Sequence, residues 1–237
     1  MSEALERRAA ELDWKSIGES LDARGWATTG PLLEAGECAR LTALYGDASR
    51  FRSRVEMARH RFGEGEYKYF AAPLPEQVAT LRRAFYAPLA AIANGWMEQL
   101  AAQDRYPADL QGMQRLCADH RQSKPTPLLL RYTAGGYNCL HQDLYGDIAF
   151  PLQLTVLLSE PEVDYTGGEF ILVEQRPRAQ SAAQVVPLCR GEAVIFATRY
   201  RPARGSRGWH RVQMRHGVSE IRSGERYALG VIFHDAA

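Results

Sequence analysis

The sequence has no long hydrophobic run, few cysteines and almost no net charge. No apolar segment approaches the roughly 18 to 20 residues that span a bilayer, and no repeat or low-complexity tract is present. The chain opens without a basic-then-apolar leader, and its cysteines lie far apart without a CxxC pair: Cys38, Cys117, Cys139 and Cys189. These absences argue against a membrane-spanning protein and against a disulfide scaffold. We therefore expect a soluble, cytoplasmic protein with reduced thiols.

The charge balance also limits the classes of partner. The chain of 237 residues has 29 basic and 28 acidic side chains, and 46% of its residues are hydrophobic. That apolar fraction is enough to bury a globular core. A surface that binds a polyanion would have to be a local patch, because the molecule as a whole is close to neutral.

The two halves of the chain differ in pattern. Apolar residues recur at helical spacing in residues 2–24, 34–47 and 75–103, the last with a break at Pro88, while 25–33 is typical of a strand and 51–70 of a long loop or hairpin. After Pro125, seven or eight short β-type runs follow one another between turn residues. We predict one α+β domain over 1–237, with a mainly helical support layer (1–124) packed on one face of a β-sandwich or jelly-roll core (125–237).

The stretch RYTAGGYNCLHQDLYGD, residues 131–147, places His141 and Asp143 two positions apart. Residues i and i+2 of a strand point to the same face, so the two side chains can converge on one point. Two imidazoles and one carboxylate form the triad that binds iron(II) in oxygenases and leaves open positions for substrates. Since an HxD spacing also arises by chance, the interpretation needs a third ligand.

Three histidines lie downstream: His210, His216 and His234. His216 opens a strand-like alternation, and the returning strand after an RSGE turn carries Arg226. A buried arginine beside a metal requires an anionic partner, which a dicarboxylate co-substrate would supply. Neither His210 nor His234 is followed by such an arginine, so His216 is the favoured third ligand, and surface or strand-end roles are favoured for the other two.

Several motifs in this order resemble a known family. The chain resembles the iron(II)- and 2-oxoglutarate-dependent dioxygenases, in particular the prolyl-hydroxylase-like branch of the double-stranded β-helix. The motifs that carry this resemblance are HQD, TGGEF, GEAVIF and HGVSEIRSGERYALGVIF. The chain resembles more closely a prokaryotic family described as oxygenases of damaged nucleic acid. The segments that carry this resemblance include RFGEGEYKYF, FPLQLTVLLSEP and TGGEFILVEQRPR. This similarity runs from about Arg61 onward. It implies a double-stranded β-helix, or cupin-like jelly roll, with helices on one face.

The resemblance implies an enzyme that binds iron(II) through His141, Asp143 and His216 and uses 2-oxoglutarate and dioxygen as co-substrates. It implies that Arg226 pairs with the distal carboxylate of 2-oxoglutarate and that Tyr132 lies near the same molecule, although Tyr132 could equally be a core tyrosine. The implied reaction converts 2-oxoglutarate to succinate and hydroxylates a second substrate, or demethylates it if the carbon is an N-methyl group. A non-catalytic binding module of the same fold would not need all four of the residues His141, Asp143, His216 and Arg226.

The second substrate is left open between two classes. Residues 199–215 carry six arginines and no acid, and with the basic-aromatic segment 59–69 they are typical of a surface for nucleic acid. The alternatives are a solvated arginine-rich loop and, as substrate, a protein, peptide or small metabolite. The candidate substrate contacts are Arg204, Arg207, Arg211, His210, Tyr67 and Tyr69. The sequence does not indicate an oligomeric state.

Overall fold

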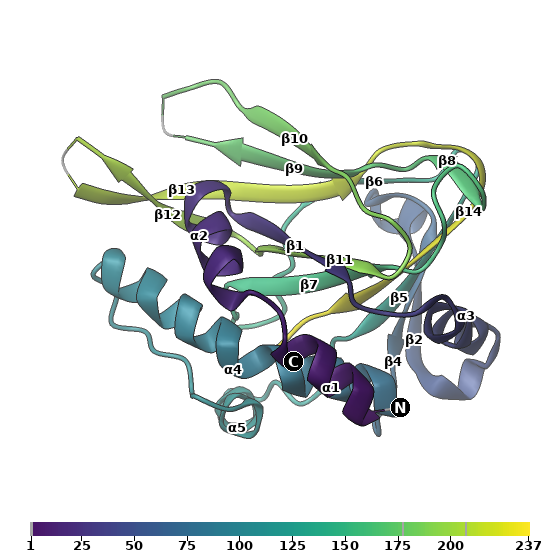
Figure 1. Ribbon diagram of the computed structural model, residues 1–237, viewed down its shortest axis with the longest axis horizontal. Coiled ribbons are helices and arrows are strands. Elements are labelled where there is room, and N and C mark those ends of the chain that lie inside the picture. The colour runs from purple at the N-terminus through teal and green to yellow at the C-terminus, as the bar shows by residue number, and fades with distance from the viewer. Residues whose placement is uncertain (1, 177, 207) are drawn as a thin grey trace.

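The computed structural model describes residues 2–176, 178–206 and 208–237, which form two antiparallel sheets and a set of helices (Figure 1). The helices are α1 (Ser2–Ala10), α2 (Trp14–Arg24), α3 (Ala35–Ala43), α4 (Glu76–Gln99) and α5 (Leu110–Asp119), with 3-10 turns η1 (Leu44–Gly46), η2 (Ala48–Arg50) and η3 (Met57–His60). In the ranges described, none of the helices is long and apolar enough to cross a membrane.

The larger sheet has eight strands. Their order is β1 (Trp26–Pro31), β11 (Glu192–Ala197), β7 (Leu152–Leu157), β14 (Ile221–Val231), β5 (Leu128–Thr133), β4 (Glu66–Phe70) and β2 (Phe51–Glu56), with β8 (Tyr165–Gly167) beside the first part of β14. The smaller sheet has six strands in the order β10 (Ala182–Val186), β9 (Phe170–Gln175), β13 (Gly208–Val218), β6 (Tyr137–His141) and β3 (Gly63–Glu64), with β12 (Tyr200–Gly205) beside β13.

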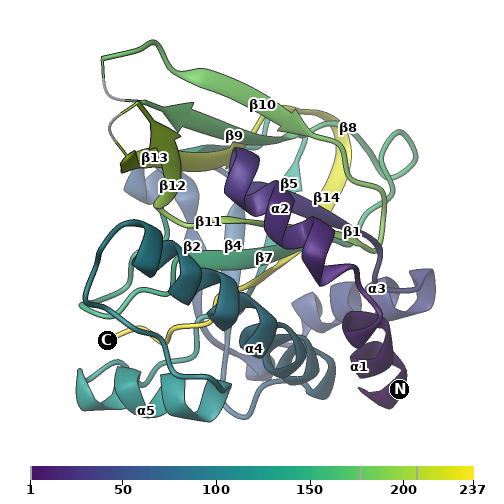
Figure 2. The ribbon, with the colours of Figure 1, turned by 60° about the vertical axis from the view of Figure 1, so that its left-hand side comes forward.

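The two sheets face each other across the core. Phe170 of the smaller sheet packs edge-on against Phe196 of the larger one, with 5.0 Å between ring centroids. Helices α1, α4 and α5 lie on the other side of the larger sheet in both views (Figures 1 and 2). Figure 1 shows no helix of the described residues over the outer face of the smaller sheet. The candidate metal-binding residues come from the inner face of the smaller sheet and from the loop that joins β6 to β7.

The helical layer differs from the sequence prediction at three points, the first of which is helix α5, a segment where no helix was predicted. The helix expected over residues 2–24 is two helices, because Asp13 caps α2 by accepting a hydrogen bond from the backbone N–H of Ser16. The break expected at Pro88 does not occur, since α4 runs through that position. Its buried face, which includes Leu81, Phe85 and Leu89, stabilises the helix against the one missing hydrogen bond.

The first half of the chain contributes more to the sheets than expected. Strand β1 forms one edge of the larger sheet, and the hairpin of β2 and β4 extends its other edge beside β5. Short strand β3 joins the smaller sheet next to β6. The segment 51–70, expected as a loop or hairpin, is therefore a hairpin that reaches both sheets.

Candidate metal centre

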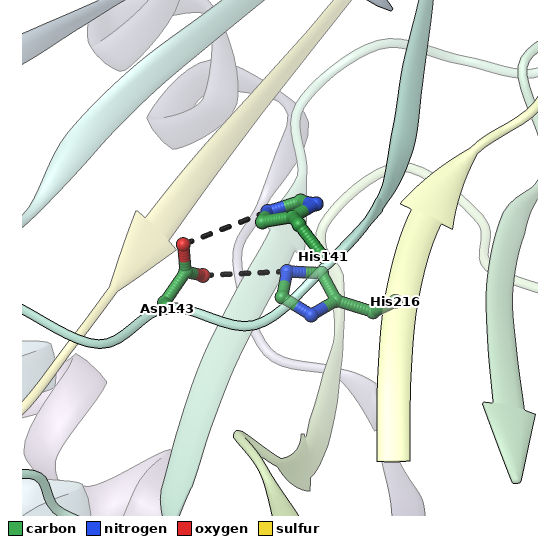
Figure 3. A group of neighbouring side chains, drawn as sticks. All are labelled: His141, Asp143 and His216. Atoms are coloured by element: carbon green, nitrogen blue, oxygen red, sulfur yellow. Dashed lines mark ion pairs between the residues drawn. The ribbon is translucent and has the colours of Figure 1, made fainter. Parts of the chain in front are cut away.

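His141, Asp143 and His216 converge on one point between the sheets (Figure 3). His141 ends β6 and His216 lies directly opposite it on β13, so their side chains leave the antiparallel pair on the same face. The two rings are 4.1 Å apart between centroids. Asp143 Oδ1 lies 3.5 Å from His141 Nε2, and its Oδ2 lies 3.3 Å from His216 Nε2.

These distances suit three ligands of one ion. Two ligand atoms that each lie about 2.1 Å from a metal at a right angle are about 3 Å apart. The three ligand atoms lie within 4.8 Å of one another, and no other such group of His, Cys, Asp or Glu occurs in the ranges that the structure describes. Two imidazoles and one carboxylate are the donor set of iron(II) oxygenase sites. The residues present therefore fit a divalent iron.

Neighbouring groups hold two of these side chains in orientation. His141 Nδ1 lies 2.8 Å from the carbonyl oxygen of Cys139, which fixes the proton on Nδ1 and leaves Nε2 free to bind. The Tyr145 hydroxyl donates to Asp143 Oδ1 at 2.7 Å, and Gln153 Nε2 donates to Oδ2 at 2.9 Å. Each carboxylate oxygen of Asp143 therefore accepts a hydrogen bond from a residue outside the candidate metal ligands.

The electrostatics of the group favour an ionised Asp143 and a neutral His216, whereas at His141 burial is outweighed by contact with Asp143, which raises the pKa of that imidazole. Burial opposes ionisation of Asp143, but hydrogen bonds and charge from His141 and His216 outweigh it and hold the pKa of the carboxyl well below its usual range. Burial, assisted by repulsion from His141, lowers the pKa of His216 to about 4. These are the protonation states in which both groups bind a metal.

His141, Asp143 and His216, which we call the metal group, line a cavity of about 370 Å³. Arg226 and Tyr132 line the same cavity. These two residues are directly opposite on β14 and β5, and the guanidinium lies 5.8 Å from the Tyr132 ring. Arg226 is only 2% exposed, and its Nε has no hydrogen-bond partner. No carboxylate of the described residues lies within ion-pair distance of Arg226, so a buried cation that contacts Tyr132 and Tyr165 lines the same cavity as the metal group without an ion-pair partner.

The remaining predicted contacts are scattered. Tyr67 lines the cavity, whereas Tyr69 is buried and packs between Tyr67 and Tyr145. His210 is half-buried on β13 opposite Ala203 of β12. His234 is fully buried, and its Nδ1 accepts a hydrogen bond from the backbone N–H of Phe150. Arg207 lies outside the described residues.

The arginine-rich segment divides into buried and exposed members. Arg201 is buried and forms an ion pair with Glu174 at 2.6 Å, so it is not part of a free basic surface. Four arginines are exposed and have no ion-pair partner among the described residues: Arg199, Arg204, Arg211 and Arg215. On the hairpin of β12 and β13 the register and strand alternation bring Arg204, Arg211 and Arg215 to one outer face, with Trp209 opposite Arg204.

Sequence reasoning missed several residues at the mouth of the cavity. Tyr145, Phe62 and Leu144 line it, and none of them was predicted as a site residue. The spacing of Tyr145, two positions after Asp143, repeats the interval that indicated the HxD pair and was a usable signal. Nothing in the local pattern of Phe62 distinguished it from a core phenylalanine.

Both the sequence and the fold of this chain are similar to those of known oxygenases. Residues 65–236 match the family model Oxygenase-NA, described as an oxygenase catalysing oxidative methylation of damaged DNA. Two uncharacterized proteins of Mycobacterium tuberculosis, from strains CDC 1551 and H37Rv, are each 49% identical over 168 residues, which cover 71% of this chain and 72% of each relative.

Among solved structures, a Pseudomonas putida prolyl-4-hydroxylase is similar with a TM-score of 0.54 and 18% identity, over 94% of this chain and all (100%) of that one. An oxidoreductase of the 2OG-Fe(II) oxygenase family from Burkholderia pseudomallei has a TM-score of 0.57 and 15% identity, over 96% and 94%. A Trichoplax adhaerens prolyl hydroxylase has a TM-score of 0.57 and 16% identity, over 98% and 91%. At these identities the likeness concerns the fold, and it confirms the predicted double-stranded β-helix.

Proposed function

Because this chain belongs to the Oxygenase-NA family of oxygenases, we propose that it is an iron(II)- and 2-oxoglutarate-dependent dioxygenase that oxidises a C–H bond in damaged nucleic acid. One observation carries the proposal. The two histidines and the carboxylate share a single cavity with a buried arginine that has no anionic partner among the described residues. A metal and a carboxylate ligand would together compensate the charges of that cavity.

His141, Asp143 and His216 would hold the iron, and the open side of the triad would receive the co-substrates. When bound, iron(II) and 2-oxoglutarate supply the oxidation of a substrate C–H bond by dioxygen, and 2-oxoglutarate leaves as succinate and carbon dioxide. Tyr145 and Gln153 keep the Asp143 carboxylate oriented through one hydrogen bond to each oxygen. His141 is kept in the correct tautomer by the carbonyl of Cys139.

Arg226 would bind the distal carboxylate of 2-oxoglutarate. A guanidinium matches a carboxylate with two parallel hydrogen bonds, and the low dielectric of a closed cavity strengthens them. The Tyr132 hydroxyl accepts a hydrogen bond from Asn138 Nδ2 at 3.2 Å, so its own proton is free to be donated to the same carboxylate. Burial raises the pKa of Tyr132, which keeps that proton in place.

Two observations support nucleic acid as the second substrate. One is the family to which the chain belongs, and the other is the set of exposed arginines without ion-pair partners in the described part of the β12 and β13 hairpin. Cationic side chains beside an aromatic residue bind phosphates and bases of a single strand. If the oxidised carbon is an N-methyl group of a base, its hydroxylation releases formaldehyde and leaves the nitrogen demethylated.

The test is to incubate the protein with iron(II), 2-oxoglutarate and single-stranded DNA that carries one N-methylated base. Succinate and formaldehyde should form in equal amounts, and the mass of the base should fall by one CH2 unit, because a hydrogen replaces the methyl group. Succinate should fall to background in His141→Ala and Asp143→Ala, but not in the matched variant His120→Ala, which changes a histidine outside the cavity. Peptide hydroxylation without any reaction on DNA would instead support the prolyl-hydroxylase-like alternative.

A further inference from the structure

Large apolar side chains are exposed around the mouth of the metal cavity. Phe62, Leu140 and Leu144 are 46%, 44% and 39% exposed, and all three line the cavity. Exposed apolar residues are usually scattered singly, whereas a cluster at the rim of a cavity marks a place where a ligand covers them. We call these three residues the apolar collar.

Phe62 is held rigidly in this position by its backbone. Its N–H donates to the Met57 carbonyl at 3.1 Å, and its carbonyl accepts from the Cys139 N–H at 2.8 Å. The next residue is Gly63, where a Cβ would lie 2.3 Å from the Tyr137 carbonyl oxygen, so only glycine lets this segment approach β6. Because the Cys139 carbonyl orients His141, a short run of backbone contacts connects Phe62 to the metal group.

The surroundings of Phe62 are aromatic and cationic. His60 stacks on its ring, with 5.3 Å between centroids and 22° between planes. Arg61 also lines the cavity, is exposed, and has no carboxylate within ion-pair distance in the described ranges. The segment 57–64 carries two arginines, one histidine and one acid, Glu64. Because Arg59 is paired with Glu56 at 2.6 Å, Arg61 is the arginine of this segment without an ion pair among the described residues. A ligand that covers the collar would therefore gain from having both flat apolar faces and negative charge.

We propose that the apolar collar binds the bases next to the one that enters the cavity, with Phe62 as the surface on which a neighbouring base stacks and Arg61 as a phosphate contact. This inference rests on the proposed nucleic-acid substrate. Every base offers a flat face, so stacking on Phe62 needs no particular sequence, and Arg61 adds attraction to the backbone between two bases. A small metabolite enclosed in the cavity would leave the collar uncovered, and a neutral peptide would leave Arg61 without a partner.

The experiment measures the binding of single-stranded DNA of five nucleotides without dioxygen, with iron(II) and 2-oxoglutarate present so that no turnover occurs. The central base is N-methylated, and one neighbour is 2-aminopurine, a fluorescent base whose emission falls when it stacks. Wild type should bind and quench the fluorescence. Phe62→Ala should bind roughly tenfold more weakly and lose the quenching, since stacking of one base contributes about that much. Phe62→Trp should restore both.

Two control variants separate the collar from other surfaces. Val185→Ala changes a side chain that is 58% exposed on β10, outside the cavity lining, and should bind like wild type. Trp209→Ala removes the aromatic side chain opposite Arg204 in the proposed nucleic-acid surface, which is 43% exposed; it should weaken binding to the hairpin of β12 and β13 but leave the 2-aminopurine quenching by Phe62 intact. Melting temperatures should agree among all variants, because the Phe62 ring is half exposed.

The outcomes distinguish this inference from the function on which it rests. Wild type that binds and quenches equally with Phe62→Ala would overturn the role of the collar and leave the nucleic-acid substrate standing. Quenching lost in Trp209→Ala but retained in Phe62→Ala would move the stacking site to the hairpin. Wild type that binds no DNA at low salt would overturn both proposals.

Discussion

The hydroxyl of Tyr145 donates a hydrogen bond to Asp143 Oδ1 at 2.7 Å, in the loop that follows β6. Gln153 supplies the matching donor for Oδ2 from the inner face of β7. The carboxylate is therefore fixed by contacts from its own loop and from the opposite sheet before any metal binds. Such outer contacts determine how well a ligand is oriented and typically change metal affinity by 10- to 100-fold.

Replacing Tyr145 by phenylalanine should weaken metal binding by about that factor while leaving the fold intact, because the ring is kept and only the hydrogen bond is lost. Calorimetric titration of the apoprotein with cobalt(II) measures this. Tyr227→Phe is the matched control, since its hydroxyl contacts exposed Glu225 outside the cavity lining. Equal affinities in Tyr145→Phe and wild type would show that the hydrogen bond does not position Asp143.

Replacing Arg226 by methionine should weaken the binding of 2-oxoglutarate without lowering the stability of the fold. The charge-assisted hydrogen bonds to a carboxylate contribute about 1.5 to 3 kcal/mol, so the affinity for 2-oxoglutarate should fall roughly 10- to 150-fold. Removing a buried charge that has no ion-pair partner among the described residues should not lower the melting temperature.

Titration with 2-oxoglutarate in the presence of iron(II) and without dioxygen gives the first quantity, and thermal unfolding gives the second. The control Arg131→Met removes an arginine on neighbouring β5 that is already paired with Glu225 at 2.6 Å. Unchanged 2-oxoglutarate affinity in Arg226→Met would contradict the assignment of Arg226 as the anion-binding residue.

The ion pair of Glu174 and Arg201 should make the free energy of unfolding depend on pH. Burial opposes ionisation of Glu174, but hydrogen bonds from Arg176 and Arg201 outweigh it and lower its pKa in the folded state. A carboxyl whose pKa is lower when folded stabilises the protein fully above its unfolded pKa, near 4.3, and this contribution is lost as the pH falls through the folded pKa.

Glu174→Gln should lower the free energy of unfolding at pH 7 by about 3 kcal/mol, because it leaves Arg201 buried without its counter-charge. Below about pH 5 its stability should fall less steeply than that of wild type. Urea unfolding at several pH values measures both, with the exposed Glu19→Gln as control. Parallel pH profiles for wild type and Glu174→Gln would contradict this account.

Neutralising the exposed arginines should change the salt dependence of DNA binding. For single strands, each lost phosphate contact reduces the slope of log affinity against log salt by about 0.7. Arg204→Gln combined with Arg211→Gln should flatten the slope by up to about 1.4. Arg54→Gln should leave it unchanged, because Arg54 is paired with Glu66 on the hairpin of β2 and β4. A slope that is the same in all three proteins would contradict a phosphate-binding role for the β12 and β13 hairpin.

Much of the architecture could be predicted from local pattern, because helical spacing and strand alternation are properties of neighbouring residues. The missed helix α5 was available to the same reasoning, since Asp109 precedes it as a capping residue. What could not be predicted was pairing between distant segments. The position of β3 beside β6, which brings Phe62 to the cavity, depends on close backbone contact at Gly63.

The residues of the candidate site could likewise be predicted where they are close in the sequence, but not where their position depends on pairing of distant strands. The HxD spacing and the interval between His216 and Arg226 were visible because each is short in the sequence. The expected strand geometry of the first pair was wrong, since β6 ends at His141 and Asp143 lies in the loop after it, whereas His216 and Arg226 lie on the hairpin of β13 and β14. The arginine-rich segment could not be sorted from sequence into buried and exposed members, because that depends on which face of β12 meets Glu174 of β9. Alternation along β12 separates Arg201 from Arg204 only once the inner face is known.

The central claim is that one cavity holds iron(II) through three side chains and 2-oxoglutarate through Arg226. Without dioxygen, chelation of iron(II) by 2-oxoglutarate produces a visible absorption band, which can be titrated directly. We predict that wild type develops this band, that His141→Ala, Asp143→Ala and His216→Ala do not, and that Arg226→Met requires a much higher concentration of 2-oxoglutarate. A wild-type protein that gives no band, or triad variants that keep it at wild-type strength, would contradict the account.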